Sequence, residues 1–294
     1  MPPGETDTPR TATGTNITLL ATRSHSMTAG KAARLERVRT GGRHLIVPMD
    51  HGVTMGAVKG LKDIESTIDA VTAGGADAVL TQRGVAPRVH DNKNGAGYIV
   101  HLNGSTTLGP DEMDKRPTGT VEDAVRAGAD AVSFHINVGS EYEPDQITQL
   151  GEVTSAADRL GMPTLAMTYA RGHDVRDDDP EAFAEDLGHA ARLGEELGAD
   201  VIKTAYSGTP ETFEHVVEST RLPVVIAGGS KGTDQETLEM VRGAMNAGAA
   251  GVSMGRSIFQ HDDPGAITEA VAAVVHDGAS ASDAVERAGL AVQV

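Results

Sequence analysis

Eight short apolar runs, rich in Val, Ile, Leu and Ala, recur along the chain and alternate with longer amphipathic stretches. Apolar runs of roughly 4–8 residues predict buried strands, and apolar residues spaced three and four positions apart predict helices. The predicted strands cover residues 45–50, 76–81, 98–103, 129–137, 163–169, 199–206, 223–229 and 251–256. The predicted helices cover residues 64–72, 121–127, 144–160, 180–197, 209–219, 234–247, 265–275 and 282–288, after a first helical pattern that opens at 27–31.

A five-residue pattern recurs at four junctions between a helix and the next strand. It reads GADAV at 75–79 and again at 128–132, GADVI at 198–202 and GAAGV at 248–252. Each copy supplies a glycine that ends a helix, a small residue and the start of a buried run. The repeat period is near that of one βα unit. Eight such units in a chain of 294 residues predict a TIM (β/α)8 barrel.

The main alternative is a doubly wound open sheet. That fold requires a glycine-rich fingerprint directly after the first strand, and the Asp-His-Gly sequence at 50–52 is not one. We therefore expect one barrel domain over residues 27–294.

Residues 1–26 are rich in Thr and are predicted to form a disordered tail, with Met27 as an alternative start. Their apolar run at 17–21 is too short for the core of a signal peptide. The chain has no run of 18 apolar residues, so no transmembrane helix is expected. These features predict a cytoplasmic protein.

The net charge of the chain argues against some classes of binding partner. The formal net charge is −17, which argues against binding of nucleic acid or anionic membranes through bulk electrostatics. Cys is absent, which excludes disulfides and thiolate chemistry. Acidic residues outnumber basic ones and Arg outnumbers Lys, a composition that suits a high-salt cytoplasm where screening weakens self-repulsion. An ordinary acidic bacterial enzyme is the alternative.

Lys203 stands inside the sixth predicted strand, in the run ADVIKTAY at 199–206. Because side chains alternate along a strand, Val201, Lys203 and Ala205 share one face. If that face points into the barrel, the amine is partly desolvated and can act as a nucleophile that forms a Schiff base. The alternative is an edge-strand lysine whose amine reaches water.

Other candidate residues lie where the predicted strands end, which is where TIM-barrel enzymes place their active sites. Asp50 and His51 follow the first strand, Tyr169 and Arg171 end the fifth, and Tyr206 ends the sixth. A carboxylate, a phenol and a lysine at neighbouring interior positions suit imine chemistry, because they can move protons around the reacting carbons. A strand-end Asp also often caps a turn, and His51 either binds substrate hydroxyls or holds that turn.

The turns after the seventh and eighth predicted strands are the usual phosphate site of such barrels. Gly228 and Gly229 end the seventh strand, and Gly255 and Arg256 end the eighth. Glycine lets a phosphate oxygen approach the backbone closely, and Arg256 can add a charged hydrogen bond. These residues therefore predict a phosphate site, to which Lys231 is a further candidate contributor.

The eleven histidines form no compact metal-binding pair, so neither a metal nor another cofactor is expected. His101 and His135 lie inside predicted strands, where a histidine is more often a hydrogen-bonded core residue than a catalyst.

Five segments in order resemble the archaeal-type class I aldolases. They are VPMDHG at 47–52, TYARG at 168–172, VIKT at 201–204, IAGGS at 226–230 and SMGR at 253–256. The similarity runs from about Met27 to the C-terminus, and the chain is most similar to the versions found in salt-loving archaea. The acidic loop at 173–179 looks longer than the usual connection in this family, which leaves open how the site is covered.

The resemblance implies a Schiff-base aldolase acting in the alternative route to 3-dehydroquinate and so to aromatic amino acids. Such enzymes condense L-aspartate 4-semialdehyde with a three-carbon unit from 1-deoxy-D-threo-hexo-2,5-diulose 6-phosphate and release hydroxypyruvaldehyde phosphate. It implies Lys203 as the Schiff-base lysine, Tyr169 as proton donor and Asp50 as proton acceptor. The implied phosphosugar-binding residues are Asp50, His51, Gly52, Val53, Thr54, Tyr169, Ala170, Arg171, Lys203, Gly228, Gly229, Gly255 and Arg256.

Three other functions remain open. The chain resembles class I fructose-bisphosphate aldolases and aldolases that join dihydroxyacetone phosphate to aspartate semialdehyde for aminohydroxybenzoate synthesis. A catalytically silent barrel that binds phosphosugars is the third. Arg83, Arg88 and Arg171 are candidates, by charge, for recognising the semialdehyde. The resemblance also implies a ring-like homo-oligomer, with a decamer as the type.

Overall fold

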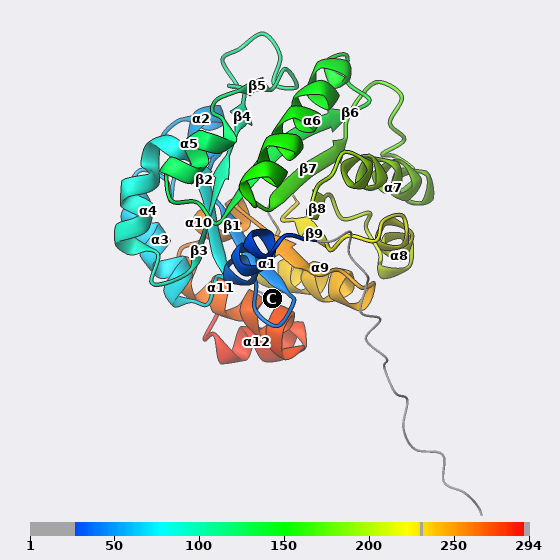
Figure 1. The fold of residues 1–294 in the computed structure, drawn as a ribbon. Coiled ribbons are helices and arrows are strands. Elements are labelled where there is room, and N and C mark those ends of the chain that lie inside the picture. Colours follow the sequence, from blue (N-terminus) through cyan, green and yellow to red (C-terminus); the bar gives the residue numbers. More distant parts are fainter. Residues whose placement is uncertain (1–26, 230–231, 291–294) are drawn as a thin grey trace, which may run out of the picture.

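The structure is a computed structural model that describes residues 27–229 and 232–290. Eight parallel strands form one closed barrel (Figure 1). Strands that follow one another along the chain are neighbours in the barrel, and the last strand pairs with the first. The strands are β1 (His44–Pro48), β2 (Ala78–Gln82), β3 (Gly97–His101), β6 (Ala131–Val138), β7 (Thr164–Ala170), β8 (Val201–Thr204), β9 (Val224–Ala227) and β10 (Gly251–Ser253). The predicted TIM barrel is therefore confirmed, while the predicted tail at 1–26 lies outside the described residues.

Helices surround the barrel, and most of them lie where the amphipathic stretches predict them. These are α3 (Ile64–Ala73), α5 (Val121–Arg126), α6 (Glu143–Leu160), α7 (Pro180–Glu196), α8 (Pro210–Glu218), α9 (Asp234–Asn246), α11 (Pro264–Ala272) and α12 (Ala281–Arg287). The predicted helix at 265–275 ends early as an α-helix and continues as the π-helical turn η3 (Ala273–Asp277). Several begin with a side-chain cap, as where Thr233 accepts a hydrogen bond from the Glu236 N–H.

Short elements at the ends of the barrel strands were not predicted. They are α2 (His51–Met55), η2 (Arg83–Val85), α4 (Ala86–Asn92), α10 (Arg256–Phe259) and the hairpin of β4 (Asn103–Gly104) and β5 (Arg116–Pro117). Elements this short carry too few residues for an apolar period to be visible in the sequence. Three of them, α2, α10 and the hairpin, contribute residues to the cavity described below.

The inner face of the barrel is a separate apolar layer. Residues at alternate strand positions fill it, as the alternation of side chains predicts. Its buried members include Ile46, Leu80, Ile99, Leu165, Met167, Val201 and Val225, with Tyr169 near the C-terminal end of its strand. A larger apolar cluster fills the space between the strands and the helices. Lys203 thus lies on a strand whose inward neighbours, Val201 and Ala205, are both in the inner layer.

The recurrent Gly-Ala-Asp pattern ties strands together in pairs at the N-terminal end of the barrel. The Asp200 N–H donates to the Thr164 carbonyl at 2.9 Å, and the Asp200 carboxylate accepts from the Thr164 N–H at 2.8 Å. Asp77 makes the same two bonds with Leu45, and Asp130 makes them with Tyr98. The pattern therefore precedes every second strand, and the expected period of one βα unit was wrong.

The fourth copy of the pattern lacks the carboxylate. The Ala250 N–H donates to the Val224 carbonyl at 2.7 Å, but a methyl group stands where the other copies carry Asp. The β9–β10 pair therefore has one hydrogen bond where the other three pairs have two.

The helix α1 (Ala29–Leu35) and the turn η1 (Glu36–Val38) cover the N-terminal end of the barrel (Figure 1). Lys31 is buried and pairs with the Asp200 carboxylate at 3.1 Å, and Arg37 pairs with Asp130 at 3.0 Å. The carboxylates of the repeat thus hold both the strand pairs and the covering segment.

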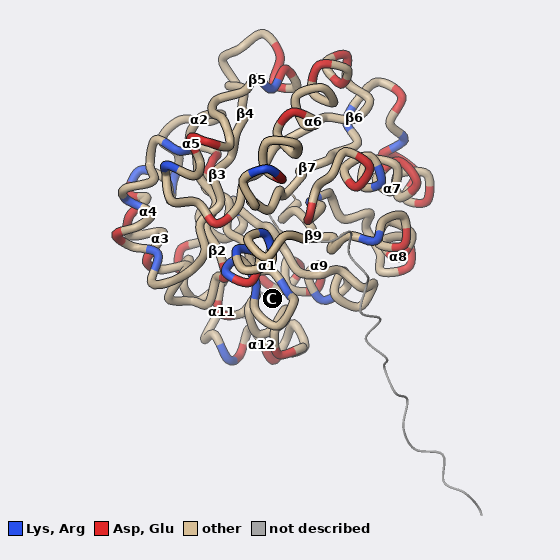
Figure 2. Tube along the Cα trace, in the orientation of Figure 1, with Lys and Arg blue, Asp and Glu red and all other residues tan. Residues whose placement is uncertain are grey.

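Acidic side chains are spread over the outer helices, among them α7 and α8 (Figure 2). Within the part of the chain that the structure describes, no helix is both long and apolar enough to cross a membrane.

Candidate active site

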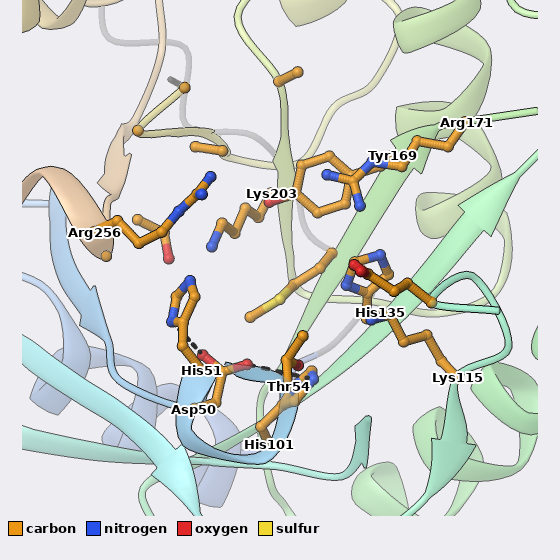
Figure 3. A pocket seen from close by; sticks show the side chains of 18 of the residues that line it. Asp50, His51, Thr54, His101, Lys115, His135, Tyr169, Arg171, Lys203 and Arg256 are labelled. Atoms are coloured by element: carbon orange, nitrogen blue, oxygen red, sulfur yellow. Dashed lines mark ion pairs between the residues drawn. The ribbon is translucent and has the colours of Figure 1, made fainter. Parts of the chain in front are cut away.

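A cavity of about 640 Å³ lies at the C-terminal ends of the barrel strands. Residues from both ends of the chain line it, because the barrel brings all eight strand ends to one rim. The side chains labelled in Figure 3 are Asp50, His51, Thr54, His101, Lys115, His135, Tyr169, Arg171, Lys203 and Arg256. The mixture of carboxylates, a phenol and several cations makes this cavity the candidate active site.

Lys203 projects into the middle of the cavity from β8 (Figure 3). Its strand neighbours in register are Met167 on β7 and Val225 on β9, both in the inner apolar layer. Only 6% of the residue is exposed. The expected position of the lysine on the inner face is therefore confirmed, and the edge-strand alternative is wrong.

Asp50 follows β1 at the start of α2 and faces two histidines. Its carboxylate lies 3.8 Å from His101 Nε2 and 3.6 Å from His51 Nδ1, which is too far for a hydrogen bond. Burial raises the pKa of Asp50, but the charges of His101, His51 and Lys203 outweigh burial and hold its pKa below the usual range. Asp50 is therefore an ionised carboxylate near neutral pH, as a proton acceptor must be.

His101 and His135 line the same cavity from neighbouring strands. His101 Nδ1 is 2.8 Å from Ser133 Oγ, and His135 Nε2 is 2.8 Å from Asn137 Oδ1. Burial lowers the pKa of His101 to about 4, against the smaller opposing effect of Asp50. Both histidines are hydrogen-bonded as expected, but the sequence did not indicate that they border the site.

Tyr169 stands at the end of β7 beside a stack of polar groups. The Arg171 guanidinium lies 4.4 Å from the centre of its ring, and the His135 ring centre is 5.0 Å away. Figure 3 shows the phenol next to the Lys203 side chain. The ring therefore packs against a cation and an imidazole, which help to fix the direction of its hydroxyl.

The turns after β9 and β10 form the wall opposite Arg171. Gly229 has a φ of +60°, and a Cβ at Gly255 would lie 2.8 Å from the Pro48 carbonyl, so both positions favour glycine. The hydroxyls of Ser253 and Ser257 are buried at this wall and have no hydrogen-bond partner among the described residues. Unpartnered buried hydroxyls beside Arg256 and two glycine turns fit an oxyanion such as phosphate.

Most of the residues predicted for the site line the cavity. They are Asp50, His51, Val53, Thr54, Tyr169, Ala170, Arg171, Lys203, Gly228, Gly229, Gly255 and Arg256. Gly52 does not line it, because it lies on another side of the short helix α2. Lys231 and Ser230 lie outside the described residues.

Two of the three arginines considered for the second substrate lie elsewhere. Arg83 donates to the Thr118 carbonyl beside a second hollow, and Arg88 pairs with Glu65 at 3.2 Å. Neither of them lines the cavity, whereas Arg171 does.

Sequence reasoning missed Lys115, Ser253 and Ser257. Lys115 lies in the loop of the β4–β5 hairpin, is buried, and lines the cavity. A solitary lysine in an irregular loop carries no periodic signal. Ser253 lies in the SMGR segment at 253–256 and Ser257 follows it, but the sequence analysis assigned a role to neither.

A buried strand lysine with a carboxylate and a phenol at the open end of a (β/α)8 barrel defines a class I, Schiff-base aldolase-type enzyme. The chain belongs to the DeoC/LacD family of aldolases, whose model matches residues 44–261.

Comparison with named proteins shows which aldolases the chain is similar to within this family. It is 66% identical to 2-amino-3,7-dideoxy-D-threo-hept-6-ulosonate synthase of Halobacterium salinarum, over 90% of this chain and 98% of that one. It is 35% identical to 2-amino-4,5-dihydroxy-6-oxo-7-(phosphonooxy)heptanoate synthase of Streptomyces griseus, over 89% and 96%. An archaeal fructose 1,6-bisphosphate aldolase of known crystal structure superposes with a TM-score of 0.77 and 32% identity, over 84% of this chain and 100% of that one.

Proposed function

We propose that this enzyme condenses L-aspartate 4-semialdehyde with a three-carbon unit taken from 1-deoxy-D-threo-hexo-2,5-diulose 6-phosphate. The product is 2-amino-3,7-dideoxy-D-threo-hept-6-ulosonate, on the alternative route to 3-dehydroquinate. The observation that carries the proposal is the 66% identity to the haloarchaeal synthase over nearly its whole length. The buried Lys203 between Asp50 and Tyr169 supports the imine chemistry that this reaction needs.

The amine of Lys203 attacks the C2 carbonyl of the sugar, and loss of water leaves an iminium. Cleavage of the C3–C4 bond sends its electron pair into the iminium, so that an enamine stays on Lys203 and hydroxypyruvaldehyde phosphate departs. The enamine then attacks the aldehyde carbon of the semialdehyde, and water releases the product from the lysine.

Proton transfers accompany these steps. The C4 hydroxyl gives up a proton as the C3–C4 bond breaks, and the oxygen of the incoming aldehyde gains one as the new bond forms. We assign this exchange to the Tyr169 hydroxyl, which lies beside the lysine (Figure 3). We assign the transfers at the carbinolamine to Asp50, because its lowered pKa keeps it an acceptor at neutral pH. Arg256, Ser253 and Ser257 are the groups we propose for the phosphate.

Borohydride trapping tests the lysine and the donor together. Each sugar phosphate — the diulose phosphate, fructose bisphosphate and dihydroxyacetone phosphate — is offered separately in high-salt buffer, and the intact and peptide masses are measured. We expect a stable adduct on the peptide containing Lys203, formed best with the diulose phosphate. Lys203→Ala should abolish the adduct and lower turnover by at least about 10³-fold.

Each other outcome has a definite meaning. An adduct on Lys115 would move the imine to the second buried lysine of the cavity. An adduct with fructose bisphosphate or dihydroxyacetone phosphate alone would favour one of the two related aldolase reactions. No adduct with any sugar in a folded sample would contradict the imine mechanism. The homo-oligomer, a decamer by resemblance, and the cytoplasmic location stay predictions.

A further inference from the structure

Two cations, Lys115 and Arg171, share one wall of the cavity, and neither forms an ion pair among the described residues. Lys115 is 9% exposed, and its Nζ donates to Ser105 Oγ at 2.7 Å. The Arg171 guanidinium lies over the Tyr169 ring. Within residues 27–229 and 232–290, neither cation has an acidic side chain at ion-pair distance. Arg171 is exposed but Lys115 is buried, and a buried cation that lacks a close counterion is costly unless a ligand supplies one.

The charges on this wall act on one another. Burial, followed by the charge of Arg171, lowers the pKa of Lys115, against smaller opposing effects of Glu112 and Asp50. Burial, then Arg171, then Lys115, hold the pKa of His135 well below its usual range. The positive potential is thus concentrated at one place, and a bound anion would relieve the repulsion.

The position of the pair relative to the reacting groups identifies which substrate it meets. In Figure 3 Lys115 and Arg171 lie on one side of Lys203, and Arg256 lies on the other. Tyr169 is on the side of Lys115 and Arg171, in contact with the Arg171 guanidinium. Because we assign Tyr169 to the aldehyde oxygen, the incoming aldehyde takes the place that hydroxypyruvaldehyde phosphate leaves beside the phenol, from which this wall is within its reach.

We propose that Lys115 and Arg171 bind the carboxylate of the incoming aldehyde substrate and so select an amino-acid aldehyde. The inference rests on the proposed function and assigns the part of the site that reads its second substrate. Glu112 and Asp177 are exposed and also line the cavity. Their carboxylates complement an α-ammonium group but would repel a second sugar phosphate, which favours a zwitterion as the occupant.

Steady-state kinetics of Lys115→Met tests the assignment. Its matched control is Lys62→Met, which changes an exposed lysine that does not line the cavity. We expect Lys115→Met to raise KM for aspartate semialdehyde about 30-fold, because a carboxylate would lose a buried charged partner. Trapping of the diulose phosphate on Lys203 should keep the concentration dependence of the wild-type enzyme. The control should leave both quantities unchanged.

Acceptors that differ only in the carboxylate make the test specific. Succinate semialdehyde keeps this group and propanal lacks it. The efficiency with succinate semialdehyde should fall in Lys115→Met by the same factor as for aspartate semialdehyde, and that with propanal should stay the same. Ser105→Ala, which removes only the hydrogen-bond partner of Lys115, should give a smaller loss of about threefold and serves if Lys115→Met fails to fold.

Three results would overturn the inference. The first is an unchanged KM for aspartate semialdehyde in Lys115→Met. The second is loss of donor trapping in that variant, which would assign the pair to the phosphate of the sugar. The third is an equal loss with propanal and succinate semialdehyde. A wild-type enzyme that traps the donor but never uses aspartate semialdehyde would instead overturn the proposed function, and this inference with it.

Discussion

His101 is a buried neutral base beside an ionised acid, and its environment makes protein stability depend on pH. The folded protein holds its pKa at about 4, whereas an imidazole in the unfolded chain has a pKa of about 6.5. Between these values the unfolded state takes up a proton that the folded state does not. The free energy of unfolding therefore falls as the pH is lowered through this window.

Replacing His101 by Asn should flatten that dependence. A full difference of about 2.5 pKa units corresponds to about 3 kcal/mol, lost between about pH 6.5 and pH 4 in the wild type. Chemical denaturation at several pH values measures it, with His215→Asn, an exposed histidine of α8, as the control. Equal slopes for His101→Asn and the wild type would contradict the expectation. The lowered pKa of Asp50 acts at lower pH, because its contribution is lost only as that carboxylate protonates.

At the residue scale, the sequence alone was enough to predict the candidate site residues that lie on a strand or directly after one. Lys203, Tyr169 and Asp50 could be placed because alternation along a strand and the rim of a barrel fix their direction. Lys115 could not be placed, since its position depends on how an irregular hairpin folds over the cavity. The pairing of His101 with Ser133 joins two strands far apart in sequence, and no local pattern encodes it.

At the scale of elements, the strands and long helices follow from apolar periodicity, whereas the short elements depend on tertiary contacts. The helix α2 is five residues long and has no buried residue, so its sequence carries no apolar stripe. The Gly-Ala-Asp pattern was recognised as a junction, but its carboxylate bonds were not. Only the barrel register shows that each Asp reaches the strand before it.

Replacing Asp200 tests how much these carboxylate bonds contribute to stability. Asp200→Ala removes the bond to the Thr164 N–H and leaves the buried Lys31 with only the exposed Asp158 carboxylate, at 3.4 Å, as an ion-pair partner. We expect the free energy of unfolding to fall by about 3 kcal/mol, and by less in Asp200→Asn, which keeps an acceptor oxygen. Urea denaturation measures this, with the exposed Asp91→Ala as the control. A loss no greater than that of the control would show that the link contributes little.

At the scale of the whole molecule, eight apolar runs joined by helices were sufficient to predict the barrel. The closure of the sheet followed from the number of units. The excess of acidic over basic residues, 42 against 25, is likewise a property of composition alone. The acidic side chains lie largely on the outer helices, where they repel one another, and counterions reduce this repulsion (Figure 2).

Stability should therefore rise with salt. We expect the thermal midpoint to increase by about 5–10 °C between about 0.2 M and about 3 M KCl, as screening removes self-repulsion. Differential scanning calorimetry measures it, and sucrose at matched viscosity controls for general solvent effects. A midpoint that does not move would favour the ordinary acidic enzyme over the salt-adapted one.

The missing carboxylate at Ala250 has a consequence for motion at the opposite rim. Among the four strand pairs that the pattern joins, β9–β10 has one bond where the other three have two, so we expect it to be the least firmly tied of the four. The same two strands carry Gly228 and Arg256 at their other ends. A phosphate held as proposed would bridge these two strands, so the substrate itself would supply, at the opposite rim, a link that Ala250 does not provide.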